Sequence, residues 1–213
     1  MSYEVELKFP VADLRAFSQK LIDLAVAVSP AREEIDLYFA HPARDFAQTD
    51  EALRLRRRGD ANYVTYKGPK IDATTKTRRE IELPLAPGPE SLAAWTALLE
   101  AVGFRPAGEV RKSRRTAVVP WQGRRAEASL DEVDGLGTFV EFELVVEEGE
   151  VEAAKVCIQS LARSFGLAQG ERRSYLELLL ISRVASSAAM THHSQVNEFG
   201  GSALRSTPPY TEQ

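Results

Sequence analysis

The sequence contains very little cysteine and histidine. Cys157 is the only cysteine in 213 residues, and histidine occurs only as His41, His192 and His193. A single cysteine excludes an intramolecular disulfide framework and a zinc site built from several thiolates. His41 precedes a proline in an expected turn, and the other two histidines lie in a polar tail. None is well placed for a Ser-His-Asp triad or a histidine-rich metal site.

Long hydrophobic runs are also absent from the sequence. No segment approaches the roughly 18 consecutive apolar residues that indicate a membrane-spanning helix, and the N-terminus lacks the basic start and apolar stretch of a signal peptide. Hydrophobic residues nevertheless make up 44% of the chain, which is enough to bury the core of one large domain. We therefore expect a cytoplasmic protein without a membrane partner.

The charges are unevenly distributed. The formal net charge is -4, yet arginines cluster within residues 54–58, 78–79, 111–115 and 124–125. An acidic protein with local basic clusters suits a small anionic ligand better than a long polyanion. This balance disfavours an RNA-binding barrel, and we expect no nucleic-acid partner.

Alternation of polar and apolar residues predicts many β-strands. In the first of them, Glu4, Glu6 and Lys8 share one face, and Val5 and Leu7 share the other. The expected strands span 3–9, 32–39, 52–58, 62–67, 76–85, 109–119, 126–133 and 138–147, with a hairpin turn at Gly59-Asp60. Helical spacing predicts helices after Pro10, around 92–103, over 151–165 and over 174–181.

The composition changes near Val184. Beyond this point Ser, Thr, Gly, Pro and Gln dominate and large apolar residues are few. We expect one domain over residues 1–182 and a disordered C-terminal tail over 183–213.

Charged residues recur at every second position in several predicted strands. In a single strand, this pattern is typical of a solvated sheet face. Six such runs indicate that the charged faces converge in a sheet closed into a tube, whose interior charges must pair or hold a ligand. The runs are Glu4, Glu6 and Lys8; Arg54, Arg56 and Arg58; Arg78, Glu80 and Glu82; Lys112 and Arg114; Glu127, Ser129 and Asp131; and Glu141 and Glu143.

The mixture of acids and bases indicates the kind of ligand. Carboxylates such as those of Glu4, Glu6, Glu141 and Glu143 offer the hard oxygen ligands that Mg²⁺ or Mn²⁺ prefers. Lysine and arginine bind phosphate oxygens. Acids for a metal facing bases for an anion are the arrangement expected for a metal-bridged polyphosphate.

The opening strand resembles the ExExK signature of the CYTH superfamily, the triphosphate tunnel metalloenzymes. The match continues in order along the chain to about Leu180 and is closest to the bacterial and archaeal class IV adenylate cyclases. Its further segments are Asp36-x-Tyr38, Leu53 to Arg56, Tyr66 to Lys70, Thr77 to Glu82, Val110 to Lys112, Leu130 to Glu143 with Gly135 and Gly137, and Arg173 to Tyr175.

The resemblance implies an α+β fold, with a closed eight-stranded antiparallel β-barrel and helices packed outside. It also implies roles for individual residues. Catalytic residues would be Glu4, Glu6, Lys8 and, by analogy with hydrolase relatives, Tyr38; metal ligands would be Glu4, Glu6, Glu141 and Glu143; the triphosphate site would use Lys8, Arg54, Arg56, Lys67, Lys112, Arg114, Asp131 and Arg173. The implied cofactor is Mg²⁺ or Mn²⁺.

The reaction stays open at this point. The leading hypothesis is a class IV adenylate cyclase, in which the ribose 3′-hydroxyl of ATP attacks the α-phosphorus and pyrophosphate leaves. The second is a triphosphatase acting on inorganic or thiamine triphosphate, in which water attacks instead. The third is a binder of polyphosphate or nucleotide without catalysis, against which the intact acidic residues argue. A homodimer is left open as the assembly.

Overall fold

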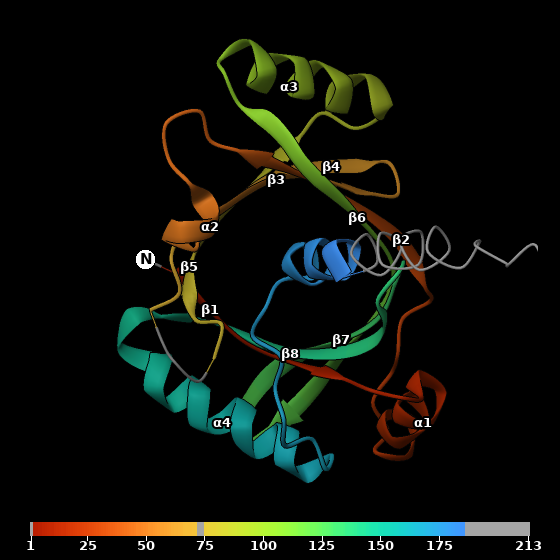
Figure 1. Ribbon diagram of the computed structural model, residues 1–213. Coiled ribbons are helices and arrows are strands. Elements are labelled where there is room, and N and C mark those ends of the chain that lie inside the picture. Colours follow the sequence, from red (N-terminus) through yellow and green to blue (C-terminus); the bar gives the residue numbers. More distant parts are fainter. Residues whose placement is uncertain (1, 72–74, 186–213) are drawn as a thin grey trace, which may run out of the picture.

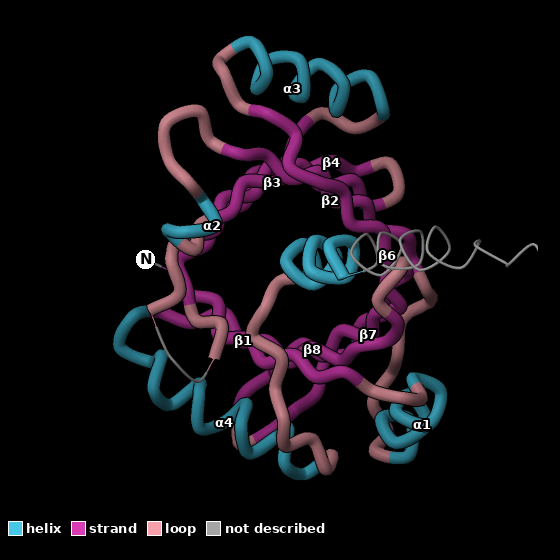
Figure 2. The backbone as a smooth tube through the Cα atoms, viewed as in Figure 1, coloured by secondary structure: helices cyan, strands magenta, loops and turns pink. Residues whose placement is uncertain are grey.

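Eight antiparallel strands close into a barrel in the order β1-β5-β4-β3-β2-β6-β7-β8 (Figures 1 and 2). The computed structural model describes residues 2–71 and 75–185. The strands are β1 (Ser2–Pro10), β2 (Arg32–Ala40), β3 (Ala52–Arg58), β4 (Ala61–Lys67), β5 (Arg78–Leu85), β6 (Arg105–Trp121), β7 (Arg124–Val133) and β8 (Gly137–Glu147). The helices are α1 (Leu14–Asp23), α2 (Phe46–Thr49), α3 (Pro89–Ala101) and α4 (Val151–Ser164), with the 3₁₀ turn η1 (Glu148–Glu150) before α4.

The predicted barrel is confirmed, and each predicted strand appears within a few residues of its expected bounds. The hairpin turn at Gly59 joins β3 to β4, and Gly59 has a φ of 60°, which a glycine adopts without strain. Helix α2 was not predicted. It has only four residues and is started by the Asp45 carboxylate, which accepts from the backbone of Ala47.

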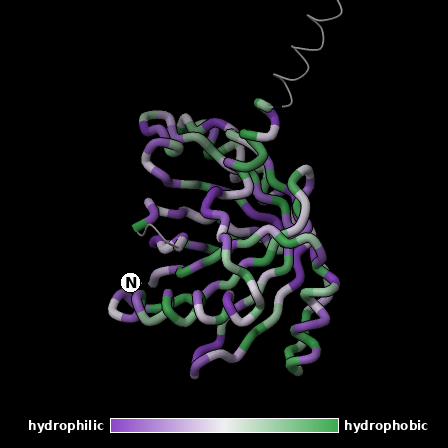
Figure 3. Tube along the Cα trace, turned by 60° about the horizontal axis from the view of Figure 1, so that its bottom comes forward, coloured by the Kyte–Doolittle hydropathy of each residue, from purple (hydrophilic) through white to green (hydrophobic). Residues whose placement is uncertain are grey.

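The barrel reverses the usual distribution of polarity, because its apolar face points outward. Val5 and Phe142 belong to a large core between the outer strand faces and helices α1 and α4, and Phe39 and Leu55 pack beneath α3. The polar face of the same strands lines the interior. Figure 3 shows hydrophilic and hydrophobic residues recurring along the strands. This arrangement leaves the charged runs facing one another.

A helix over residues 175–185 lies across the barrel opening in Figures 1 and 2. Its first residue, Tyr175, packs with Tyr38, Val110 and Phe139 inside the barrel wall. The helix predicted over 174–181 is therefore present and longer. It includes residues 183–185, the start of the expected tail; the remainder, 186–213, lies outside the described residues. Among the described helices, none is long and apolar enough to cross a membrane.

Candidate active site

The barrel encloses a cavity of about 900 Å³. All six charged runs predicted from the sequence contribute to its wall. The predicted site residues that line it are Glu4, Glu6, Tyr38, Arg54, Arg56, Lys67, Lys112, Arg114, Glu141 and Glu143. Lys8 and Asp131 lie behind this wall, and Arg173 lies outside it.

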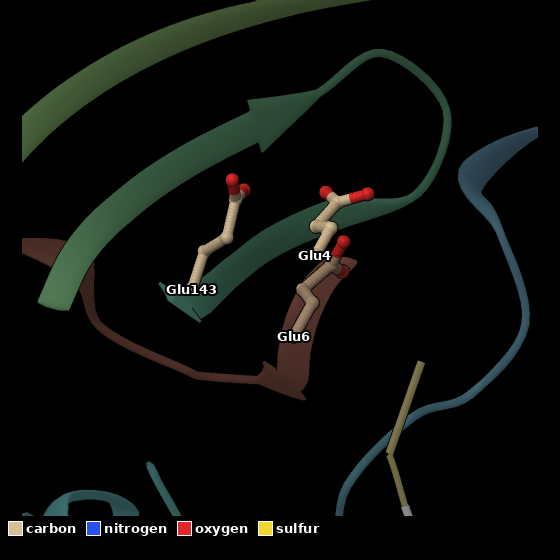
Figure 4. Close-up of side chains that lie close together, drawn as sticks. All are labelled: Glu4, Glu6 and Glu143. Carbon is tan, nitrogen blue, oxygen red and sulfur yellow. The ribbon is translucent and has the colours of Figure 1, made fainter. Parts of the chain in front are cut away.

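Three carboxylates converge on one side of the cavity. Glu4 and Glu6 extend from β1 and Glu143 from β8, and one oxygen from each lies within 4.8 Å of the others (Figure 4). Burial raises the pKa of Glu143 well above its usual range, and the neighbouring Glu4 carboxylate adds to the increase. Burial likewise raises the pKa of Glu4. The crowded carboxylates therefore favour a cation between them, and three oxygen donors fit Mg²⁺ or Mn²⁺.

Glu141, the fourth predicted metal ligand, lies in a different environment. Its Oε2 accepts from Arg114 Nη2 at 2.6 Å, and its Oε1 lies 3.9 Å from the amine of Lys76. Burial would raise the pKa of Glu141, but Arg114, Lys76 and Lys8 hold it well below its usual range. The structure thus places Glu141 among cations, whereas Glu143 lies among acids.

A basic group surrounds Asp36 of β2. Arg56 donates to both oxygens of this carboxylate, at 2.6 and 2.7 Å, and Lys112 donates at 3.2 Å and Arg54 at 3.5 Å. Burial would raise the pKa of Asp36, but these cations hold it well below its usual range. Burial and the nearby Arg56 lower the pKa of Lys112 to about 8.

One nitrogen of this basic group is unsatisfied. Arg54 Nε is buried and has no hydrogen-bond partner among the described residues, although its side chain lines the cavity. A buried donor without a partner is costly, and the oxygen of an anionic ligand would satisfy it.

Lys67 pairs with two carboxylates of the cavity wall. Its amine lies 2.6 Å from Glu4 Oε2 and 2.7 Å from Glu80 Oε2. Burial would lower the pKa of Lys67, but Glu4 and Glu80 raise it. Lys67 is therefore held as a cation at the cavity wall, and its predicted contact with the triphosphate stays a prediction.

Lys8 and Asp131 lie deeper than predicted. The Lys8 side chain is only 1% exposed; its amine donates to the carbonyl of Arg173 and lies 4.0 Å from the centre of the Tyr175 ring. Burial and the neighbouring Lys76 lower the pKa of Lys8 to about 7. Asp131 accepts from Arg114 and, at 2.8 Å, from the Tyr175 hydroxyl. In this structure, both residues support the wall.

Arg173 is not brought into the cavity. Its side chain is exposed and donates to the Glu171 carboxylate from Nε at 2.9 Å. Its predicted role as a triphosphate ligand stays a prediction. The backbone of Arg173 does contact the interior, because its carbonyl accepts a hydrogen bond from the Lys8 amine.

Sequence reasoning missed several charged residues of the interior. Glu34 is fully buried, and its carboxylate lies 3.4 Å from Lys112 and 3.6 Å from Arg56. Glu34 and Asp36 stand at period two in their strand, so the same pattern could have identified them. Lys76 stands two residues before Arg78 and lies within the strand predicted over 76–85, although β5 begins only at Arg78. Continuing the run of Arg78, Glu80 and Glu82 by one step could therefore have identified it.

The cavity continues to a rim near α2. The rings of His41 and Phe46 line it there among the charged Arg44 and Glu51, and Leu176 also lines the cavity. The rings of His41 and Phe46 lie 5.3 Å apart, and Arg44 lies 5.3 Å from the Phe46 ring centre. Aromatic and apolar side chains at one end of a phosphate-type cavity suit an organic group attached to the phosphates.

Comparison with known proteins agrees with this geometry. The family model of the CYTH domain matches residues 2–175. The chain belongs to the CYTH family. This membership confirms the resemblance found in the sequence, and CYTH proteins bind triphosphate substrates and depend on metal in general.

The match with this chain covers nearly the whole length of individual relatives. "Putative adenylate cyclase MJ0240" of Methanocaldococcus jannaschii is 33% identical over 178 residues, covering 82% of this chain and 97% of the relative. The PH1819 protein of Pyrococcus horikoshii OT3 is 39% identical with a TM-score of 0.71, covering 83% of this chain and 98% of that one. The solved structure of a putative adenylate cyclase from Vibrio parahaemolyticus is 26% identical with a TM-score of 0.70, and the match covers 83% of this chain and 97% of that one.

Proposed function

We propose that this protein is a metal-dependent adenylate cyclase that converts ATP to cyclic AMP and pyrophosphate inside the barrel. The observation that carries the proposal is the division of one cavity into an acidic wall, with three carboxylates within 4.8 Å of one another, and a basic wall built around Asp36. Two of the relatives carry the name adenylate cyclase, and the rim at His41 and Phe46 offers a place for the nucleoside.

In this proposal, Glu4, Glu6 and Glu143 hold the metal, with Glu141 alongside. When bound, the metal supplies Lewis-acid polarisation of phosphoryl oxygens. Arg54, Arg56, Lys67, Lys112 and Arg114 bind the triphosphate and stabilise the negative charge that grows on the pyrophosphate as it leaves. The side chains thereby position the α-phosphorus for the ribose 3′-hydroxyl, and catalysis is mostly orientation and electrostatics.

Prior pairing of the cations supports this role. Asp36 holds Arg56 through two hydrogen bonds and Lys112 through a third, so these side chains already occupy fixed positions. Preorganised donors lose little conformational freedom when the ligand binds.

A substrate panel tests the proposal. The purified protein is incubated with Mn²⁺ and, separately, with ATP, inorganic triphosphate and thiamine triphosphate. We expect cyclic AMP and pyrophosphate from ATP in equal amounts. Phosphate release from inorganic or thiamine triphosphate with no cyclic AMP from ATP would replace the cyclase with a triphosphatase. Tight triphosphate binding without turnover of any substrate would replace it with a binding protein.

A further inference from the structure

The connection between β4 and β5 brings one more lysine to the carboxylates. Lys76 is 6% exposed, and its amine lies 2.5 Å from Glu6 Oε1 and 3.9 Å from Glu141 Oε1. Its backbone N–H donates to the Glu6 carbonyl at 3.0 Å. The backbone of Lys76 is thus fixed to β1 while its side chain reaches into the acidic wall.

The carboxylate that Lys76 contacts belongs to the group that fits a metal. Glu6 is one of the three acids whose oxygens lie within 4.8 Å of one another. An ammonium at 2.5 Å from Glu6 and a divalent cation bound to the same carboxylate would repel each other strongly in a cavity partly shielded from water. The two cations therefore compete for Glu6.

A displaced Lys76 has another anion within reach. Its side chain lines the same cavity as the basic wall, and the long flexible stem of lysine lets the ammonium move while the backbone stays in place. Triphosphate oxygens in that cavity would accept it.

Lys67 provides an instructive contrast. Its amine bridges two carboxylates, Glu4 at 2.6 Å and Glu80 at 2.7 Å, so it keeps Glu80 if Glu4 binds a metal. Among the residues that the structure describes, the second acid near Lys76 is the more distant Glu141, at 3.9 Å. Loss of Glu6 therefore affects Lys76 more than loss of Glu4 affects Lys67.

We propose that Lys76 is an exchangeable counter-ion of the metal site. It pairs with Glu6 when the site lacks metal and passes to the triphosphate when a metal takes Glu6. Metal and triphosphate then favour each other's binding through this one side chain, and the coupling is reciprocal. Lys76 is accordingly a positioning residue. The inference rests on the proposed metal role of Glu4, Glu6 and Glu143 but holds for a cyclase or a hydrolase alike.

Direct Mn²⁺ binding tests the competition without any turnover. The full chain and its Lys76→Met variant are titrated with Mn²⁺, and free Mn²⁺ is followed by electron paramagnetic resonance. Without triphosphate, we expect the variant to bind Mn²⁺ about tenfold more tightly, because the competing charge is gone. Diimidotriphosphate, whose bridging nitrogens resist cleavage, should then raise the Mn²⁺ affinity of the variant about tenfold less than that of the wild type.

Controls separate this role from a structural one. Lys70→Met removes a lysine in the same connection that pairs with Asp50 at 2.7 Å, and it should bind Mn²⁺ as the wild type does. Lys76→Arg keeps the charge and should also resemble the wild type. Should Lys76→Met fail to fold, Lys76→Gln gives the same readout.

The outcomes distinguish the inference from the proposed function. Unchanged or weaker Mn²⁺ binding by folded Lys76→Met, with clear binding by the wild type, overturns the role of Lys76 alone. If neither protein binds Mn²⁺, the metal role of the three carboxylates fails, and the inference fails with it.

Discussion

At the scale of single residues, the wall of the cavity is built from charge pairs that are mostly buried. Lys67 pairs with Glu4, Lys76 with Glu6 and Arg56 with Asp36. Buried pairs contribute little net stability, but removing one partner strands the other at a high cost. This arrangement keeps the interior folded without ligand while holding the cations and acids that a metal-triphosphate complex would use.

Substitution of Glu6 should remove activity while leaving the fold intact. We predict that Glu6→Gln lowers Mn²⁺-dependent turnover by about 100-fold or more, because the amide keeps the volume of the side chain but not its negative charge. The measurement is product formation from the substrate panel at saturating Mn²⁺, with the circular dichroism spectrum to confirm the fold. Glu100→Gln, an exposed change on α3, is the charge-matched control. Equal activity in the two variants would refute the metal role of Glu6.

At the scale of elements, two segments outside the strands shape the ends of the cavity. The segment from His41 to α2 forms the rim, and the helix over 175–185 supplies Tyr175 and Leu176 to the wall. The helix is held by the distant contact of Tyr175 with Asp131, whereas the segment from His41 is positioned locally. His41 Nδ1 accepts from the backbone N–H of Arg44 at 3.0 Å, which fixes its ring beside Phe46.

The rim should discriminate between organic and inorganic triphosphates. We predict that Phe46→Ala raises the KM for ATP about tenfold, because contact between a base and an aromatic ring contributes roughly 1–3 kcal/mol. The binding of inorganic triphosphate should be unchanged. Gln48→Ala, an exposed change in the same helix, controls for loosening of α2. A parallel loss for both triphosphates would mean that Phe46 supports the wall and does not contact a nucleoside.

Tyr175 fastens the C-terminal helix to the interior. Its hydroxyl donates to buried Asp131 at 2.8 Å, so Tyr175→Phe should lower the free energy of unfolding by about 1.5–3 kcal/mol, as for a hydrogen bond to a charged group. The ring that lies 4.0 Å from Lys8 Nζ is retained. Urea unfolding measures the change, with the half-buried Tyr63→Phe on β4 as control. A similar loss in both variants would argue against a specific role for this hydrogen bond.

At the scale of the whole molecule, the closed barrel could be predicted because charge alternation repeats in strands far apart in sequence. Glu4 and Glu6 share a face by the period of their strand, and Glu143 lies directly opposite Glu6 where β1 pairs with β8, so the three carboxylates meet. The depth of each residue could not be predicted in this way. Alternation assigns Lys8 the same face as Glu6, but only the packed Tyr175 ring shows that its amine is covered. Alternation likewise extends the run of Arg78 and Glu80 back to Lys76, but it does not show that the Lys76 amine contacts Glu6.

The same interior pairs make the free energy of unfolding depend on pH in the acidic range. Asp36 and Glu34 are buried, which would raise the pKa of each, but Arg56 lowers both, helped by Lys112 at Asp36 and by Arg114 at Glu34. A carboxyl group whose pKa is lowered in the folded state stabilises the protein at pH values above the ordinary pKa of that group, which is 3.8 for Asp36 and 4.5 for Glu34. This contribution is lost as the pH falls below that value towards the lowered pKa.

The free energy of unfolding should therefore fall steeply between about pH 5 and pH 2, by roughly 1.4 kcal/mol per pH unit for each such group. Urea unfolding across this range measures the slope. Asp36→Asn should flatten it and should also cost about 3–5 kcal/mol at neutral pH, because Arg54, Arg56 and Lys112 lose their shared partner. Glu33→Gln, on the outer face of the same strand with its side chain 63% exposed, should keep the wild-type profile. If Asp36→Asn also keeps that profile, the cations around Asp36 do not depend on its charge, and the pairing that organises the basic wall must be reassigned to Glu34.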